Sequence, residues 1–135
     1  MTRIICIAAL LISASAFVHA KERQCFPTKH ASVPVITDMT YHKARKRLLA
    51  KGWQPHQTKS FNTAADDPDI AYGNGKGFWA KGYVEVEACA GTGVAPCAFL
   101  FKDVYGTKLR IFTVGEEDPG SKAYARVSGF QFICN

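Results

Sequence analysis

The chain has 135 residues, of which 47% are hydrophobic and 21% are charged, with a formal net charge of +6 at pH 7. This length suits one domain with a single core, and after the first segment no apolar run is long enough to cross a bilayer, which argues against a multidomain or membrane-spanning protein. The excess of basic residues favours acidic partners over basic ones.

Residues 1–20 have the three parts of a cleavable secretory signal peptide. Arg3 supplies a positive amino end, Ile4 to Phe17 form an apolar run broken only by serines, and a small-residue cleavage site ends at Ala20. The run is shorter than the ~20 apolar residues of a membrane span, and no cysteine stands in a lipoprotein-type site. We therefore expect residues 21–135 to form one small domain that is periplasmic or secreted.

Removal of residues 1–20 takes away Cys6 and leaves an even set of four cysteines, which are Cys25, Cys89, Cys97 and Cys134. In a short exported chain such a set predicts two disulfides. Several pairings are open. We favour Cys89–Cys97, which flanks a Gly-rich turn, and Cys25–Cys134, which would tie the two ends together. No Cys-x-x-Cys occurs, so we expect neither a zinc site, nor a thioredoxin-like redox site, nor any other cofactor.

In chain order, residues 33–36 (Val-Pro-Val-Ile) suit an extended edge segment. From Thr40 to Lys51 the apolar period becomes helical, with Thr40 as a plausible N-cap and with one buried stripe made by Tyr41, Ala44 and Leu48. Gly52 supplies the left-handed residue that ends a helix, and Trp53 follows where a large ring can close over the helix end. We therefore predict one helix here.

Residues 54–81 are the least regular part, with polar turn-forming stretches at 66–69 and 72–77. A connection of this length is unusual inside a compact domain. It is therefore either a mobile functional loop or a region that hides a short strand, and the sequence leaves both alternatives open.

Four strands are predicted in quick succession, over residues 83–89, 97–102, 108–114 and 124–134. The connections are short, and Asp103–Gly106 has the form of a tight hairpin turn with Gly at the position of positive φ. Short connections imply an antiparallel meander. We predict an α+β fold, in which an antiparallel four- to five-stranded sheet carries one main helix on one face and two disulfides. The expected core residues are Leu48, Phe99, Phe101 and Phe132.

No motif with catalytic chemistry stands out, so we expect no catalytic residue and a protein that is not an enzyme. His30, His42 and His56 are scattered along the chain, and the cysteines are explained as bridged. Glu85 and Glu87 lie two apart on a predicted strand and project from the same side. We interpret them as the solvated face of a sheet, with acid–base hydrolysis by paired carboxylates as the alternative.

Two surfaces are candidates for binding. The first is the turn Gly93, Val94, Ala95 and Pro96, which a disulfide would hold rigid and exposed, as in protein inhibitors that insert a loop into a cleft. The second is the basic stretch around Arg45 and Arg47, which would place several cations on the predicted helix opposite an anionic wall polymer, membrane headgroups or an acidic protein. Outside the cell, nucleic acid is not an expected partner.

Two stretches carry a resemblance to a known class. Residues 33–53, with Val33-Pro34, Leu48 and Gly52-Trp53, and the hairpin 87–97 resemble small exported uncharacterised proteins of Gram-negative bacteria. The first stretch is also similar to the start of a PASTA module, although Asp38 replaces the usual Gly before the helix. The resemblance implies a periplasmic protein built from a helix and a disulfide-pinned β-meander, and the PASTA likeness implies peptidoglycan binding.

The sequence therefore predicts a non-enzymatic periplasmic or secreted binding protein, such as an inhibitor or immunity factor that acts on another exported protein. The alternative is a module that binds anionic cell-wall or membrane components through the basic helix. The oligomeric state stays open.

Overall fold

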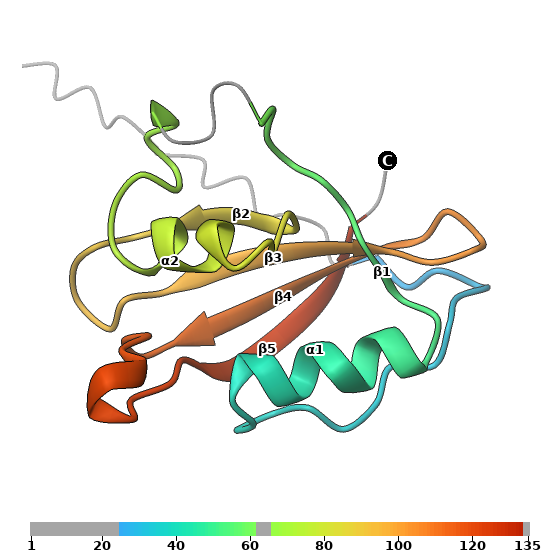
Figure 1. The fold of residues 1–135 in the computed structure, drawn as a ribbon. Helices are drawn as coiled ribbons and strands as arrows, with labels where there is room; N and C mark the ends of the chain where they lie inside the picture. Colours follow the sequence, from blue (N-terminus) through green and yellow to red (C-terminus); the bar gives the residue numbers. More distant parts are fainter. Residues whose placement is uncertain (1–24, 62–65, 134–135) are drawn as a thin grey trace, which may run out of the picture.

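The computed structural model describes residues 25–61 and 66–133 (Figure 1). The predicted signal peptide, residues 1–20, lies outside these ranges. The elements run in the order α1 (Tyr41–Ala50), β1 (Gln54–Pro55), α2 (Asn74–Ala80), β2 (Val86–Cys89), β3 (Cys97–Lys102), β4 (Lys108–Val114), a short 3₁₀ helix (Pro119–Ser121) and β5 (Arg126–Ile133). The predicted α+β class is confirmed.

All strands pair antiparallel around the central strand β3. β4 lies along one edge of β3, and β5 lies beyond β4. The other edge of β3 is shared, because β1 pairs with its end and β2 pairs with its start. The sheet thus has five strands in four positions.

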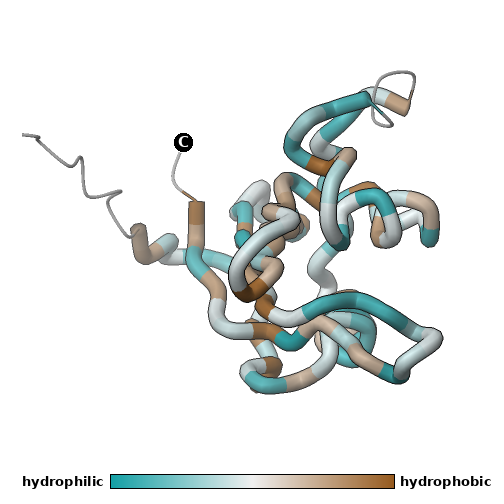
Figure 2. Tube along the Cα trace, turned by 90° about the vertical axis from the view of Figure 1, so that its left-hand side faces the viewer, coloured by the Kyte–Doolittle hydropathy of each residue, from teal (hydrophilic) through white to brown (hydrophobic). Residues whose placement is uncertain are grey.

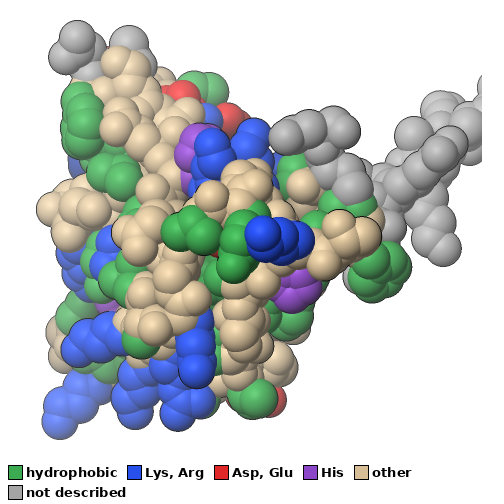
Figure 3. Space-filling model, turned by 90° about the vertical axis from the view of Figure 1, so that its right-hand side faces the viewer, with side chains coloured by type: hydrophobic (Ala, Val, Ile, Leu, Met, Phe, Trp, Pro, Cys, Tyr) green, Lys and Arg blue, Asp and Glu red, His purple; other side chains and the backbone are tan. Residues whose placement is uncertain are grey.

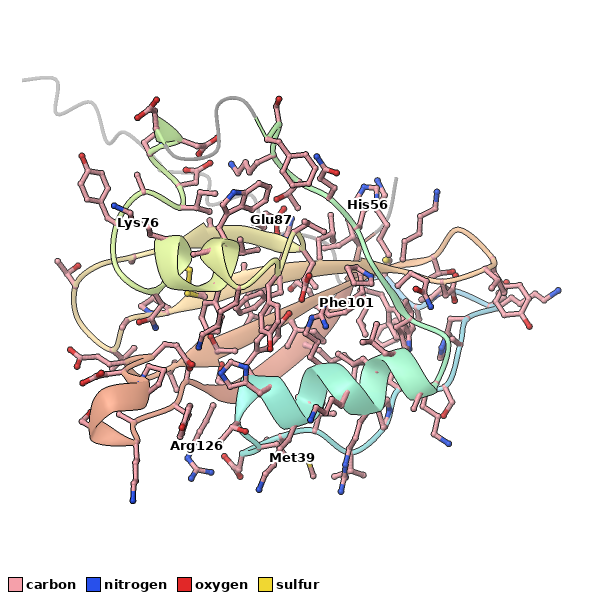
Figure 4. All side chains as sticks on the ribbon, in the orientation of Figure 1. Met39, His56, Lys76, Glu87, Phe101 and Arg126 are labelled. Carbon is pink, nitrogen blue, oxygen red and sulfur yellow. A yellow bond between two sulfur atoms is a disulfide. The ribbon has the colours of Figure 1, made fainter. Side chains whose placement is uncertain are left out.

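Both helices pack on the same face of the sheet (Figure 1). α1 is amphipathic, and its stripe of Tyr41, Ala44 and Leu48 is fully buried, as predicted. Phe78 of α2 completes the core, since its ring centroid lies 5.4 Å from Tyr41 and 5.0 Å from Phe99. Figure 4 shows Phe101 of β3 in the layer between the helices and the sheet.

The two ends of α1 are held by backbone contacts and by Trp53. Thr40 stands at the N-cap but its side chain makes no capping hydrogen bond. Instead the Tyr41 amide donates to the Ala125 carbonyl at 2.8 Å, which ties the helix start to the approach of β5. At the other end Gly52 has φ +91°, which favours glycine, and Trp53 is buried with its ring nitrogen donating to the Ser32 carbonyl at 3.1 Å.

The predicted strands at 97–102 and 108–114 are confirmed at both ends, and two other predicted strands begin later than expected. The strand predicted from Tyr83 begins at Val86, because residues 83–86 form a turn closed by a hydrogen bond from the Val86 amide to the Tyr83 carbonyl. The strand predicted from Tyr124 begins at Arg126. Residues 33–36 belong to no strand.

The irregular region 54–81 contains two elements. The short strand β1 agrees with one of the two alternatives left open by the sequence. The helix α2 occupies a stretch that reads as polar and turn-forming, so the prediction of a single main helix is incomplete. Two glycines lower the helix propensity of the α2 sequence, so the sequence does not predict this helix. The packing of Phe78 in the core stabilises it.

The Cys89–Cys97 disulfide is present. The second predicted pair includes Cys134, which lies outside the described residues, so the Cys25–Cys134 bridge stays a prediction. No helix among residues 25–61 and 66–133 has the length and apolar character needed to cross a membrane. Figure 2 agrees with this, because hydrophobic residues occur there in short segments along the coloured tube.

Candidate binding surface

The turn between β2 and β3, residues 90–96, is named here the hairpin tip. Its base is closed by the disulfide between Cys89 and Cys97, which stand opposite each other in the sheet register. Just beyond the disulfide, the Ala90 amide donates to the Pro96 carbonyl at 2.9 Å. The base of the hairpin tip is therefore held by a disulfide and by a backbone hydrogen bond, and the disulfide is the one predicted from the sequence.

The four predicted tip residues differ in exposure. Val94 is the apex, with 65% of its surface exposed, and Gly93 and Pro96 are exposed beside it. Ala95 is turned inward and buried, and its amide donates to the Thr92 carbonyl at 3.3 Å. The exposed apolar side chains among the four are therefore Val94 and Pro96, and Ala95 supports the turn from inside.

Asn74 of α2 fastens the hairpin tip to the rest of the domain, a role that the sequence did not reveal. Its buried Nδ2 donates to the Gly115 carbonyl at 2.8 Å and lies 3.5 Å from the Ala95 carbonyl, while Oδ1 accepts from the Glu117 amide at 2.9 Å. The Gly115 amide in turn donates to the Val94 carbonyl at 2.7 Å. Because a buried amide with its partners satisfied rigidifies its surroundings, the tip and residues 115–117 are held as one unit.

An open pocket of about 620 Å³ lies beside the hairpin tip and is named here the tip pocket. It is formed where the tip, the end of β4 and the loop before β5 meet. Its lining side chains are the apolar Val94, Val114, Ala123 and Tyr124 and the polar or charged Thr40, Glu116, Lys122 and Arg126. Tyr124 is 38% exposed, so its ring is available to a ligand.

A second open pocket, of about 500 Å³, adjoins the first and is named here the cationic pocket. Lys43, Lys46 and Arg47 of α1 line it, and it shares Thr40 and Arg126 with the tip pocket. Figure 4 shows Arg126 and Met39 on the side of the molecule below α1, and Figure 3 shows Lys and Arg side chains gathered along the same lower edge. The two surfaces that the sequence offered as alternatives therefore meet at Arg126.

Arg45 does not join the other cations of α1. Its Nε donates to Oε1 of Glu85 at 2.6 Å, and its guanidinium lies 4.4 Å from the centre of the Tyr83 ring. Tyr41 donates its hydroxyl to the same Glu85 oxygen at 2.8 Å. Burial, and then the Glu85 carboxylate, raise the pKa of Tyr41 well above its usual value, so the phenol keeps the proton that it donates. Arg45 thus compensates a buried charge and is not offered to a ligand.

The prediction that Glu85 and Glu87 share a solvated face is wrong. Glu85 is fully buried in the turn before β2 and points to α1. Glu87 lies on β2 and makes a two-point contact with Arg110, with N···O distances of 2.7 Å and 2.9 Å. The turn at residues 83–86 breaks the two-residue period from which a common side was inferred.

A groove of about 650 Å³ on the sheet face opposite the helices includes His56 and Glu87 (Figure 4). Glu85 is not part of its lining. The two lining carboxylates of the groove are Glu87 and Asp69. Asp69 is paired with Lys59 at 2.8 Å, so it is not a free acid or base for hydrolysis by a carboxylate pair. The single glutamate of the groove is already held by Arg110, so we place no site there.

His42 belongs to a polar cluster that the scattered histidines of the sequence did not suggest. Its Nε2 lies 2.5 Å from Oε1 of Glu117, and its Nδ1 lies 2.8 Å from the Tyr83 hydroxyl. Lys81 adds a contact of 3.0 Å to the same Glu117 oxygen. In neutral His42, Nε2 donates to Glu117 and Nδ1 accepts from Tyr83, so every polar atom of the ring has a partner.

This cluster supports the wall of the tip pocket. The ring of His42 contacts Tyr124 edge-on, with a centroid distance of 5.7 Å, and Oε2 of Glu117 accepts from the Ala125 amide at 3.1 Å. Tyr124 lines the tip pocket. The cluster therefore holds the loop before β5 against α1, and we assign it a structural role.

Replacing Glu117 by Gln is expected to lower the free energy of unfolding by about 1–2 kcal/mol at neutral pH. Burial raises the pKa of Glu117, but hydrogen bonds from His42, Lys81 and the Ala125 amide outweigh burial and bring the pKa below its ordinary value. A carboxyl whose pKa is lowered by folding stabilises the protein above its unfolded-state pKa. That stabilisation is lost as the pH falls through the folded-state pKa.

Urea unfolding between about pH 7 and pH 3 measures this effect. The difference between the wild type and Glu117→Gln should shrink toward the acid end. The matched control is Glu116→Gln, at an exposed neighbouring position, with an expected change within about 0.5 kcal/mol. A Glu117→Gln effect that stays constant across this range would show that the carboxylate charge does not matter.

Among residues 25–61 and 66–133, no group of three or more His, Cys, Asp or Glu side chains is arranged to hold a metal ion. The tip pocket and the cationic pocket adjoin each other, with Arg126 between them, and form the candidate site. Comparison of the chain with known protein families, with curated proteins and with solved structures finds no match.

Proposed function

We propose that this protein is a non-enzymatic binding protein that works outside the cytosol and holds another exported protein, in the manner of an inhibitor or immunity factor. The observation that carries the proposal is the position of Val94. It is 65% exposed, at the apex of a disulfide-closed turn, and it forms part of the wall of the tip pocket of about 620 Å³.

Rigidity is the physical reason why this arrangement suits protein binding. A turn that is already fixed loses little conformational entropy when a partner closes on it. The Cys89–Cys97 disulfide and the Asn74 amide fix both sides of the hairpin tip. Val94 can then enter a cleft of the partner, while the tip pocket receives an apolar side chain of the partner. Side chains that fill pockets in this way supply most of the binding energy at protein interfaces.

Export of the protein is the second part of the proposal and rests on two features. Residues 1–20 have the charge, apolar run and small-residue end of a secretory signal. The disulfide between Cys89 and Cys97 is of the kind that persists in oxidising compartments. Together they favour a periplasmic or secreted location and a partner from the same compartment.

The test is capture of a partner from periplasmic extract by the immobilised protein and by two matched variants. Val94→Asp places a charge at the apex of the hairpin tip, and Val104→Asp makes the same change at an exposed valine on a different turn. We expect the wild type and Val104→Asp to retain the partner in about 1 M salt, where surface charges are screened. Val94→Asp should lose it.

Circular dichroism of the two variants checks that both are folded. A partner that is retained equally by Val94→Asp and by Val104→Asp would overturn the assignment of the hairpin tip as the binding surface.

A second candidate function is binding of an anionic wall or membrane component by α1. It is favoured by the cationic pocket, where Lys43, Lys46, Arg47 and Arg126 face a single lining carboxylate, that of Asp38. In the same capture experiment, a ligand that is lost in about 1 M salt and lost with the double change Lys46→Ala and Arg47→Ala would support this candidate. Arg45 is left unchanged because it is paired with Glu85.

A further inference from the structure

The turn between β3 and β4 projects from the end of the sheet that is remote from the hairpin tip, at the right of Figure 1. Two apolar side chains stand at its apex, since Val104 is 82% exposed and Tyr105 is 51% exposed. Apolar side chains grouped on a protruding turn mark an interaction site when polar groups surround them. The chemistry around this apex therefore decides what it would contact.

The turn is rigid and turns its own acidic group inward. Asp103 is buried, and its Oδ1 accepts from the amides of Tyr105 at 3.0 Å and Thr107 at 2.8 Å. Its Oδ2 accepts from the Ala31 amide at 2.7 Å. Gly106, with φ +83°, closes the turn as the sequence predicted. The carboxylate charge is thus taken up by backbone amides and is not presented beside Val104.

Cations surround the apex instead. Lys102 and Lys108 stand directly opposite each other in the register of β3 and β4. Like charges in this position repel each other and weaken a strand pair. Lys29, from the segment before α1, places its ammonium 4.4 Å from the centre of the Tyr105 ring. Within the described ranges, none of these three lysines has a carboxylate at ion-pair distance.

We propose that this end of the molecule docks on an anionic lipid surface, with Val104 and Tyr105 entering the headgroup region and with Lys29, Lys102 and Lys108 pairing with lipid phosphates. We name these five residues the apical collar. Aromatic and aliphatic tips bury their apolar parts at a membrane interface, while lysines reach the phosphates on long flexible stems. Each lysine near an anionic leaflet strengthens the attraction, and bound phosphates would relieve the Lys102–Lys108 repulsion.

The shape and charge of this end favour a lipid surface over a protein cleft. The apical collar is convex, and none of the three pockets described above includes any of its residues. Figure 3 shows the face at this end of the molecule, where Lys and Arg predominate among the charged side chains and hydrophobic side chains lie between them. A lipid headgroup layer is deformable and anionic. It can therefore surround a convex apolar apex and contact the cations at its rim.

The test is co-sedimentation of the protein, purified from the periplasm of an expressing host, with vesicles of phosphatidylglycerol and phosphatidylcholine. We expect the double change Val104→Ser and Tyr105→Ser to weaken partitioning about tenfold, from the lost apolar burial. The double change Lys102→Gln and Lys108→Gln should weaken it at least tenfold and remove the preference for phosphatidylglycerol. Val35→Ser, at an exposed valine outside the apical collar, is the matched control and should bind as the wild type does.

Fluorescence measures insertion directly. With bromine-labelled lipids, Val104→Trp should be quenched on binding. Val35→Trp, at an exposed position outside the apical collar, should not be quenched beyond the wild type, whose Trp53 is buried and whose Trp79 is partly buried. Absence of binding to phosphatidylglycerol vesicles at low salt would overturn the proposal, as would equal binding by the Val104→Ser, Tyr105→Ser variant. Binding to immobilised polyglutamate that exceeds binding to vesicles would assign the apical collar to an acidic protein instead. These outcomes do not depend on the hairpin tip, so they are separate from the capture experiment.

Discussion

Replacing Arg45 by Met is expected to lower the free energy of unfolding by about 3–5 kcal/mol. The reason is the fully buried carboxylate of Glu85, for which Arg45 supplies the compensating positive charge at 2.6 Å. Tyr41 donates to the same oxygen, and Oε2 of Glu85 has no hydrogen-bond partner among the described residues. Removal of the guanidinium would leave a buried charge with one neutral donor.

A domain of this size has a stability of roughly 5–15 kcal/mol, so the loss would bring it close to unfolding. Urea unfolding at neutral pH measures it. The matched control is Lys46→Met on the exposed side of the same helix, with an expected change within about 0.5 kcal/mol.

The double change Arg45→Met and Glu85→Gln should recover part of the loss, because no charge then remains to be compensated. The difference between the double variant and the sum of the two single variants gives the coupling between Arg45 and Glu85. If Arg45→Met lowers the free energy of unfolding no more than Lys46→Met does, the buried ion pair does not stabilise this fold.

Replacing Gly75 by Ala is expected to destabilise the protein by about 3 kcal/mol, the upper end of the usual range for an overpacked site. Alanine is normally favoured over glycine inside a helix by ~1 kcal/mol. At Gly75, however, a Cβ would lie 2.6 Å from the carbonyl oxygen of Ile70 and 2.7 Å from its Cα. Both are backbone atoms, so α2 itself would have to move away from the preceding segment.

Gly77 supplies the matched control, since it lies in the same helix and a Cβ there would meet nothing within 4 Å. Gly77→Ala should therefore raise stability by up to ~1 kcal/mol. The same substitution is thus expected to stabilise the protein at residue 77 and to destabilise it at residue 75. Thermal unfolding of the two variants measures both effects. A stabilising Gly75→Ala would show that α2 does not pack against Ile70 as described.

The strands and α1 could be predicted because one face of each is buried and the other is not. β4 alternates the buried Leu109, Ile111 and Thr113 with less buried neighbours, and this gives the two-residue period directly. α1 shows the helical period in the same way. The hairpin tip was also predictable, since two cysteines flank a short turn in a chain that reads as exported.

α2 could not be predicted, because nothing local distinguishes its sequence from a turn. Its start is fixed by Asn74, whose side chain reaches Gly115 and Glu117 far along the chain. Glu85 was misjudged for a related reason. Its burial depends on Arg45 and Tyr41, which lie on a distant helix, so no local pattern reports it.

The candidate binding surface was predictable only in its parts. The hairpin tip and the basic helix were each recognised from the sequence, but their meeting at Arg126 depends on how the chain before α1 lies against β5. Thr40 forms a single bridge with Arg126, and the Val127 amide donates to the Met39 carbonyl at 2.9 Å. These are long-range backbone contacts, which a one-dimensional pattern does not contain.

The sharing of one edge of β3 by β1 and β2 has a consequence for how the chain folds. The two short strands act as a single edge strand that is interrupted by the excursion 56–85, which carries α2. The β2–β3–β4–β5 meander has only local connections and can form early, whereas β1 reaches β3 only after the loop 56–85 has closed. We expect amide hydrogens of β2–β5 to be protected from exchange first during refolding, and β1 to pair last.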